Sequence, residues 1–344
     1  MYKDLVMEPK ITIREAAALL ETSPSVVQAY LNNNNLVAKR SGTTSYFGHE
    51  TARELFNFQT SSKALSFQIV KGGTGKTTMA SAFAIRASLY GLKILCIDMD
   101  QQGNLSQVFG VNADEHPIMI DVLVEDYDIN DAIVKVAPGI DVIASRLENA
   151  MLDEALKMIS APLPRAYADY FDKLKGIYDL IIIDCPPNLG QSVAAITLAV
   201  DSVIAPVSME GFAIAGLEAT CLSIDELETK YERDIDLKIL VNKYDKRSKI
   251  CNTLYESVIQ DAIYKNFLVQ SFVNSSQDFP NSILEGESIF DKIQITQAKK
   301  DIDDICREIL DFKPILKDRK YKSKKTKKSH VKKITTDTSE NVNV

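Results

Sequence analysis

Apolar runs and helix-like patterns alternate along most of the chain. Six runs have the composition of strands that a parallel sheet buries on both faces. They are 65–69, 93–98, 140–145, 178–184, 203–207 and 237–241. Helical spacing occurs between and after them, at 79–87, 146–159, 165–174, 212–231 and 295–310. This order predicts an α/β fold with a mostly parallel, doubly wound sheet.

The chain before residue 60 has a different pattern. Thr12 and Ser23 are placed to cap two short helices, the second with Pro24 at its first position. Two such helices joined by a tight turn fit a helix-turn-helix, although Glu21 stands where these modules usually have a turn glycine. Residues 36–47 then predict a small β-wing. The candidate DNA contacts are Ser25, Gln28, Lys39 and Arg40. The alternative is a helical appendage that packs on the rest of the protein without touching DNA.

Polar residues 57–63 predict a hinge between two independent cores. The predicted domains are therefore 1–62, a DNA-binding helix-turn-helix, and 63–312, the α/β domain, with 313–344 as a tail. Residues 313–333 hold eleven Lys and Arg against one acid, although the whole chain has a net charge of −7. We predict a disordered basic tail on an acidic body, with Lys324 and Lys325 as DNA contacts. The alternative is a solubilising extension.

Cysteine usage and hydropathy argue against a disulfide-rich, a zinc-binding or a membrane-spanning protein. The five cysteines are scattered and include no C-x-x-C pair, so neither a disulfide framework nor a zinc site is indicated. No apolar run approaches the length of a membrane-spanning helix, and no apolar leader follows Met1. These features predict a cytoplasmic protein.

The candidate chemistry lies in the loop 70–78, between the first predicted strand and helix of the α/β domain. Its glycines let backbone N–H groups converge on an anion, because no Cβ blocks the approach. Lys76 can then reach phosphates and the Thr77 hydroxyl can ligate Mg²⁺. Asp184 projects from the carboxyl end of its strand, where ligands of open parallel sheets bind, and Asp98 is a second metal candidate. The alternative is a glycine-rich turn without a ligand.

Three motifs in this domain resemble those of one family. The loop K-G-G-x-G-K-T-T at 71–78 resembles the deviant Walker A motif of the ParA/MinD family of P-loop ATPases. The segments D-x-D-x-Q-G-N at 98–104 and 178–187 resemble its Walker A′ and Walker B motifs. The resemblance covers residues 65–311 and implies a P-loop NTPase fold with ATP and Mg²⁺ as cofactors.

The resemblance also implies roles for individual residues. Lys76 compensates phosphate charge, Asp100 orients the attacking water, and Lys71 reaches across a dimer interface to the partner's ATP. The alternative for Asp100 is a loop carboxylate that caps the next helix. Asn242 reads the adenine edge, and 273–276 forms a second base-contacting loop. The implied nucleotide-binding residues are Lys71, Gly72, Gly73, Thr74, Gly75, Lys76, Thr77, Thr78, Asn242, Asn274, Ser275 and Ser276.

DNA contacts of the body are a separate expectation. In the family, the second base-contacting loop often carries arginines that contact DNA, and those positions here hold Ser275 and Asp278. Lys243 and Arg247 are the candidates that remain on the body.

The resemblance implies a ParA-type partition ATPase. Such a protein hydrolyses ATP weakly, forms an ATP-sandwich homodimer, binds DNA non-specifically and is stimulated by a ParB-type adaptor. The helix-turn-helix resembles that of larger plasmid ParA proteins, which repress their own operon. Three alternatives remain: a MinD-like membrane-cycling ATPase, an iron–sulfur carrier of the same fold, and a repressor that senses nucleotide without turnover. The first needs an amphipathic C-terminal helix that 317–333 lacks, and the second needs paired cysteines.

Overall fold

A seven-stranded sheet forms the centre of the computed structural model, which describes residues 7–58, 60–125, 127–160, 162–210 and 213–314. The strand order is β10-β9-β4-β8-β5-β7-β6, and all neighbours are parallel except β6 and β7. The bounds are β4 (Lys63–Phe67), β5 (Ile94–Asp98), β6 (Ile133–Ala137), β7 (Ile140–Ile143), β8 (Leu180–Asp184), β9 (Ser202–Ser208) and β10 (Leu237–Asn242). The predicted α/β class is confirmed.

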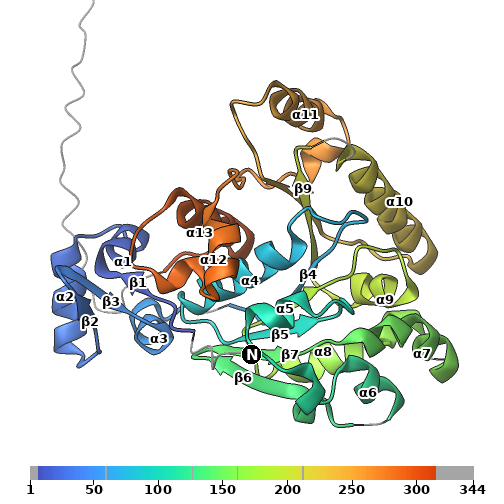
Figure 1. Ribbon diagram of the computed structural model, residues 1–344, viewed down its shortest axis with the longest axis horizontal. Coiled ribbons are helices and arrows are strands. Elements are labelled where there is room, and N and C mark those ends of the chain that lie inside the picture. The colour runs from blue at the N-terminus through green and yellow to red at the C-terminus, as the bar shows by residue number, and fades with distance from the viewer. Residues whose placement is uncertain (1–6, 59, 126, 161, 211–212, 315–344) are drawn as a thin grey trace, which may run out of the picture.

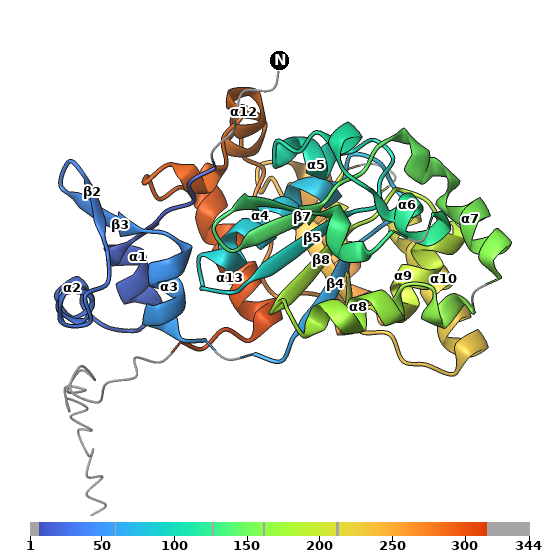
Figure 2. The ribbon, with the colours of Figure 1, turned by 90° about the horizontal axis from the view of Figure 1, so that it is seen from below.

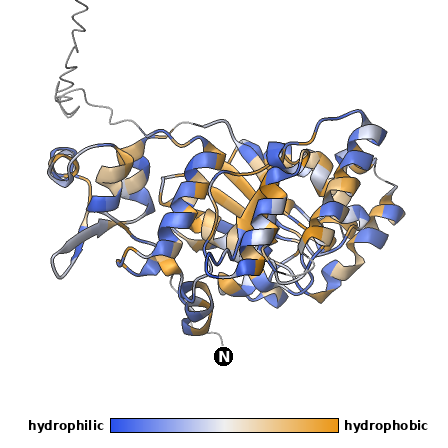
Figure 3. Cartoon of the chain, turned by 90° about the horizontal axis from the view of Figure 1, so that it is seen from above, coloured by the Kyte–Doolittle hydropathy of each residue, from blue (hydrophilic) through white to orange (hydrophobic). Residues whose placement is uncertain are grey.

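Helices cover both faces of this sheet (Figures 1 and 2). Side chains alternate along each strand, so Cys96 and Ile182 pack in one apolar layer with α4 and α13, whereas Ile97 and Ile183 pack in another with α8, α9 and α10. In Figure 3 the strands are hydrophobic and the outward faces of the helices are largely hydrophilic. The helix bounds are α4 (Lys76–Ser88), α5 (Asn104–Val108), α6 (Met119–Val124), α7 (Leu152–Ile159), α8 (Ala168–Lys175), α9 (Gln191–Ala199), α10 (Ala213–Tyr231), α11 (Lys249–Gln260), α12 (Asp278–Glu285) and α13 (Gln297–Leu310).

Two predicted helices begin later than their apolar spacing indicates. The range 146–159 starts with a 3₁₀ turn, Leu147–Met151, before α7. The range 165–174 follows a second 3₁₀ turn, Leu163–Arg165, before α8. The edge strand β6 is not among the predicted strands, because it is half-buried and lacks an uninterrupted apolar run.

Residues 7–58 form an N-terminal module with the predicted pair of capped helices. Its elements are β1 (Ile11–Thr12), α1 (Ile13–Leu19), α2 (Pro24–Asn33), β2 (Lys39–Ser41), β3 (Thr44–Phe47) and α3 (His49–Phe56). Thr12 and Glu15 form a capping box at α1, and Ser23 caps α2. Glu21 lies between them at φ 49°, so it adopts the left-handed conformation that a turn glycine normally provides. The strands β1, β3 and β2 form a small sheet in which β2 and β3 are the predicted wing.

The N-terminal module and the α/β domain share one apolar core, contrary to the expectation of two independent cores. Phe56, Phe58 and Tyr90 all pack around Phe312, with Tyr90 stacked at a centroid distance of 3.8 Å. Arg53 donates to the Gly91 carbonyl oxygen at 2.8 Å. The polar segment 57–63 therefore does not act as a hinge between two separate bodies, although the domain boundary at 62/63 stays a prediction.

A buried charge network crosses the same contact. Arg86 of α4 is buried, and its Nε donates to Asp303 Oδ1 at 2.6 Å, while the Tyr90 hydroxyl donates to the same oxygen at 2.7 Å. Arg86 Nη1 lies 4.0 Å from Glu15 Oε1. Because Glu15 also caps α1, the helix that follows the P-loop is joined electrostatically to the first helix of the N-terminal module.

Replacing Arg86 with Met should lower the free energy of unfolding by about 3–5 kcal/mol, because Asp303 loses a buried counter-charge. Denaturant unfolding followed by circular dichroism measures this change. Arg247→Met is the control, since the Arg247 side chain is 85% exposed. A variant at Arg86 that is as stable as this control would contradict a structural role for the network.

Candidate nucleotide-binding and catalytic site

The loop 70–75 joins β4 to α4 and has the geometry of an anion site. Gly73 and Gly75 have φ values of 77° and 93°, a region that other residues rarely adopt. Gly75 is the N-cap of α4, and no side chain caps the helix there. The first N–H groups of α4, together with those of the glycine turn, are thus the donors that a phosphate group would meet.

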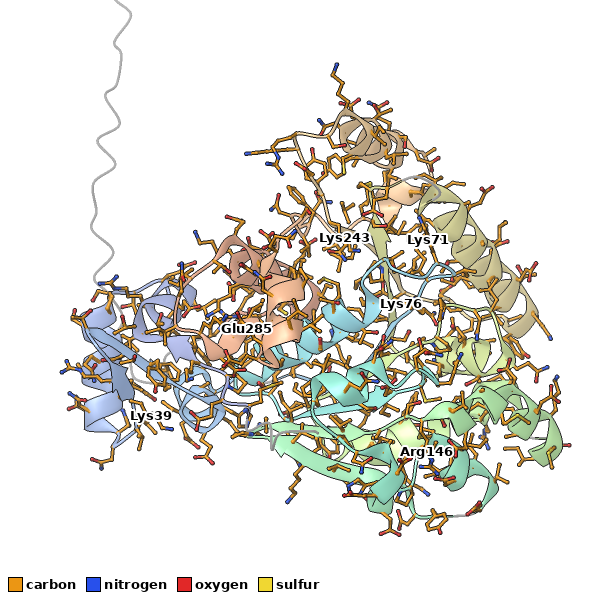
Figure 4. The ribbon with its side chains drawn as sticks, viewed as in Figure 1. Lys39, Lys71, Lys76, Arg146, Lys243 and Glu285 are labelled. Atoms are coloured by element: carbon orange, nitrogen blue, oxygen red, sulfur yellow. The ribbon has the colours of Figure 1, made fainter. Side chains whose placement is uncertain are left out.

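Lys76 is the first residue of α4 and lies at the centre of this site (Figure 4). It is 7% exposed, and its Nζ donates to the Lys71 carbonyl oxygen at 3.1 Å. Burial lowers the pKa of Lys76, against the opposing effect of the nearby Asp184 and Asp100 carboxylates. The ammonium group is therefore buried close to two acids, where an added phosphate charge would favour its protonated form.

Asp98 and Asp184 lie side by side, as paired residues at the carboxyl ends of the parallel strands β5 and β8. Asp98 is already bonded, accepting from the Ser106 N–H and hydroxyl at 2.9 and 2.8 Å and from the Asp100 N–H at 3.2 Å. Burial raises the pKa of Asp98 to about 6, although the bonds from Ser106 oppose the shift. Asp98 thus organises the turn from β5 to α5. Ser106 is its main hydrogen-bond donor, a role that no sequence pattern indicates.

Asp184 is the less well compensated carboxylate of the two. It is fully buried, and neither oxygen has a well-formed hydrogen bond in the described chain, although the Thr77 hydroxyl is near enough to lower its pKa. Burial first, and then the Asp98 charge, raise the pKa of Asp184 well above its usual range. A cation beside Asp184 would remove this cost, and Mg²⁺ bound to phosphates uses only one or two protein carboxylates. The residues therefore fit a Mg²⁺ site at Asp184 and Thr77.

Asp100 lies beside this pair and is 7% exposed. Its Oδ1 accepts from the Gln102 N–H at 3.0 Å, and its carbonyl oxygen accepts from Gly103 at 2.9 Å. These bonds shape the turn before α5, but no side chain caps α5 at Gly103, so Asp100 does not cap that helix. The same placement brings Asp100 close enough to Lys76 to affect its pKa. Its part in orienting water stays a prediction.

Comparison with known proteins agrees with this geometry. A plasmid partition protein of Borrelia burgdorferi, solved with AMPPNP, has the same fold, with a TM-score of 0.59 at 22% identity over 73% of this chain and 99% of that one. The protein family described as an AAA domain matches residues 62–239.

Two relatives decide the family. The chromosome partitioning protein ParA of Caulobacter vibrioides is 30% identical over 206 residues, 58% of this chain and 74% of that protein. The sporulation initiation inhibitor protein Soj of Bacillus subtilis is 30% identical over 213 residues, 60% of this chain and 83% of that protein. The chain belongs to the ParA-type ATPases. As a member, it is an ATP hydrolase with ATP and Mg²⁺ as its cofactors.

The predicted adenine side of this ParA-type site consists of two neighbouring segments. Tyr244, after β10, forms an isolated parallel bridge with Asn274, and the Ser275 N–H donates to the Tyr244 carbonyl oxygen at 2.9 Å. The Asn274 amide donates to Asp301 at 2.9 Å, and Ser276 Oγ accepts from the Asp278 N–H. The amide of Asn242 donates to the Thr74 carbonyl oxygen at 2.7 Å. The structure thus brings these segments together, and their contact with adenine stays a prediction.

The predicted DNA contacts do not form one surface. Ser25 and Gln28 lie on α2 and Lys39 and Arg40 on β2, at one end of the molecule (Figure 4). Arg247 lies before α11 and pairs with Asp245, whereas Lys243 donates to the P-loop. Lys324 and Lys325 lie outside the described residues. Among the helices that are described, none is long and apolar enough to cross a membrane.

Replacing Asp184 with Asn should raise the stability of the nucleotide-free ParA-type ATPase by about 1 kcal/mol at pH 7.5, because it removes a buried charge whose desolvation outweighs the help of Lys76 and Thr77. The melting temperature should rise by about 2–4 °C. The pKa of Asp184 in the folded protein lies above the 3.8 of an unfolded carboxyl group, so the ionised carboxylate lowers the stability of the fold at neutral pH. As the pH falls through the folded pKa, Asp184 becomes protonated and the stability gained by Asp184→Asn should shrink.

The Asp184→Asn variant should also lose the extra thermal stabilisation that Mg²⁺ adds to ATP, measured with and without EDTA. Asp172→Asn is the control, because its side chain is 73% exposed. A destabilised variant that keeps the Mg²⁺ effect would show that the metal is held elsewhere.

Proposed function

We propose that this chain is a partition ATPase that moves or positions DNA in the cytoplasm, in association with the nucleoid. The observation that carries the proposal is the loop with Lys71 and Lys76, placed beside Asp100 and Asp184 at the carboxyl edge of the sheet. DNA is the proposed cargo because one relative is named for chromosome partitioning and one protein of the same fold is named for plasmid partition. The cargo is thus a plasmid or a chromosomal locus.

The proposed hydrolysis assigns one task to each residue. The N–H groups of 72–78 and the Lys76 ammonium hold the phosphates, and Thr77 and Asp184 hold Mg²⁺, which neutralises developing charge when bound. Asp100 orients the attacking water. Lys71 acts on the nucleotide of a second subunit, so ATP favours a sandwich homodimer. A ParB-type adaptor then stimulates turnover.

The proposed DNA contacts are of two kinds. The N-terminal module, with its capped helices, left-handed turn and exposed Lys39 and Arg40, binds an operator and represses the chain's own operon. Arg247 and the basic segment that includes Lys324 and Lys325 bind DNA without sequence preference, through phosphate charge.

A nucleotide-sensing repressor is the second candidate function. The shared core and the Arg86 network favour it, because they connect the P-loop helix to the N-terminal module. The two candidates differ in whether DNA and the adaptor raise the rate of ATP turnover.

Replacing Asp100 with Ala should leave ATP bound and unhydrolysed, because the phosphate donors remain and the water loses its orienting group. Turnover should fall by at least about 100-fold, while ATP still drives dimerisation in sedimentation experiments. Lys76→Ala is the contrasting variant, and it should abolish ATP binding itself. Normal turnover by Asp100→Ala would assign the water to another residue.

Replacing Gln28 with Ala should weaken binding to the operator by about 1–3 kcal/mol and leave basal ATP turnover unchanged, because Gln28 can pair with an adenine edge in the major groove. Footprinting on DNA upstream of the coding sequence measures the loss. Gln260→Ala is the control, because Gln260 is an exposed glutamine at the end of α11, and it should bind the operator as the wild type does. If Gln28→Ala protects the operator as fully as the wild type does, α2 is not the helix that recognises the base sequence.

A further inference from the structure

Two side chains at the end of β10 hold the outer side of the P-loop. Asn242 Nδ2 donates to the Thr74 carbonyl oxygen at 2.7 Å, and Lys243 Nζ donates to the Gly73 carbonyl oxygen at 2.7 Å. Neither contact is suggested by the sequence, since about 170 residues separate the partners of each bond. In Figure 4 Lys243 lies over the loop near Lys71 and Lys76, far from Lys39.

These bonds fix the direction of the donors that face phosphate. A peptide unit is planar and trans, so its carbonyl oxygen and the next N–H point in opposite directions. Holding the Gly73 oxygen therefore directs the Thr74 N–H, and holding the Thr74 oxygen directs the Gly75 N–H, toward the other side of the loop. Glycine-rich peptides rotate easily without such restraint.

The strand end is built to present these two donors. Lys243 has a φ of 53°, a left-handed conformation that costs a lysine about 1–2 kcal/mol. Asn242 Oδ1 accepts the Lys243 N–H at 2.8 Å, and the Tyr244 N–H donates to the Val273 carbonyl oxygen at 2.9 Å. A strained conformation held by its surroundings is typical of functional positions.

The fit between Asn242 and the loop is close. Asn242 is 3% exposed, and a Cβ at Gly75 would lie 2.4 Å from its Nδ2. Gly75 is therefore required both by its φ of 93° and by the approach of Asn242. The buried amide and the loop are packed as one unit.

We propose that Asn242 and Lys243 are positioning residues of the ATP site, which brace the P-loop so that its N–H groups converge on the phosphates. Lys243 thereby acts on nucleotide binding and not as a contact to DNA phosphate. The inference rests on the proposed ATP cycle at this loop, and it adds two residues that act through the loop backbone.

Lys243→Met tests the brace in the full-length protein. The affinity for a fluorescent ATP analogue with Mg²⁺, measured without DNA, should fall about 3- to 10-fold, the range of one hydrogen bond. The KM for ATP should rise by the same factor with kcat nearly unchanged, because Lys243 does not touch the reacting atoms. Lys243→Arg keeps a donor at this position and should recover most of the affinity.

Lys246→Met is the matched control, since Lys246 is an exposed lysine in the same segment. It should bind ATP as the wild type does. If Lys243→Met also binds ATP like the wild type and loses DNA affinity instead, the brace is wrong and Lys243 is a DNA contact. If Lys243→Arg is as impaired as Lys243→Met, the hydrogen bond is likewise refuted. Wild-type ATP binding by Lys76→Ala would instead refute the proposed function itself.

Asn242→Ala separates bracing from base recognition. A brace acts on phosphate binding, so the variant should lose affinity for ATP and for inorganic tripolyphosphate by the same factor, with a single cooperative unfolding transition confirming that it folds. A loss confined to ATP would overturn the brace at Asn242 and assign its amide to the adenine ring.

Discussion

An incompletely compensated buried carboxylate, Asp184, is the constraint around which the site is arranged. The interior strands of a parallel sheet carry apolar side chains on both faces, and charges are accommodated where the strands end. Asp98 and Asp184 end neighbouring strands and lie side by side there. The N–H and hydroxyl of Ser106 stabilise Asp98, whereas Asp184 has only the neighbouring Lys76 and Thr77. The fold without ligand thus keeps an unfavourable charge that a bound cation relieves, so that stability and Mg²⁺ binding are opposed at this position.

The helix α4 connects this site to the rest of the molecule. Lys76 begins the helix, and Arg86, in its last turn, bonds Asp303 of α13 and approaches Glu15 of α1. A rigid helix with a fixed contact at each end transmits a displacement of one end to the other. The N-terminal module also shares the core around Phe312, so packed side chains and a buried ion pair connect α4 to the two capped helices. These contacts are the physical basis of the second candidate function, in which the module senses the nucleotide.

Local patterns predict the parts of this structure that local forces determine. Four aliphatic residues before Asp184 specify a strand buried on both faces, and the glycines before Lys76 specify the phosphate loop. The caps at Thr12 and Ser23 specify two helix starts. Contacts between distant segments have no such local signal. Phe312 joins the core of a module about 250 residues earlier in the chain. The sequence does not distinguish Lys243 from other surface lysines, although its side chain contacts the P-loop. The sequence predicts a poor turn residue at Glu21, yet backbone hydrogen bonds from Glu21 and Thr22 to the carbonyl oxygens of α1 accompany its left-handed conformation.

In the proposed cycle, Lys76 acts on the chain's own nucleotide and Lys71 on that of a partner. Lys76 donates to the Lys71 carbonyl oxygen, and an ammonium group has three donors, so Lys76 can keep this bond while it faces an anion. With the Gly73 and Thr74 carbonyl oxygens held from outside, three carbonyl groups of the loop are fixed before any ligand binds. A pre-ordered loop loses little conformational entropy on binding. The Lys71 Cβ lies beside α10, 3.0 Å from where a Cβ at Gly216 would stand, so a small residue at 216 leaves room for this lysine. The backbone of Lys71 thus belongs to the phosphate loop, and the action of its side chain on the ATP of a second subunit stays a prediction.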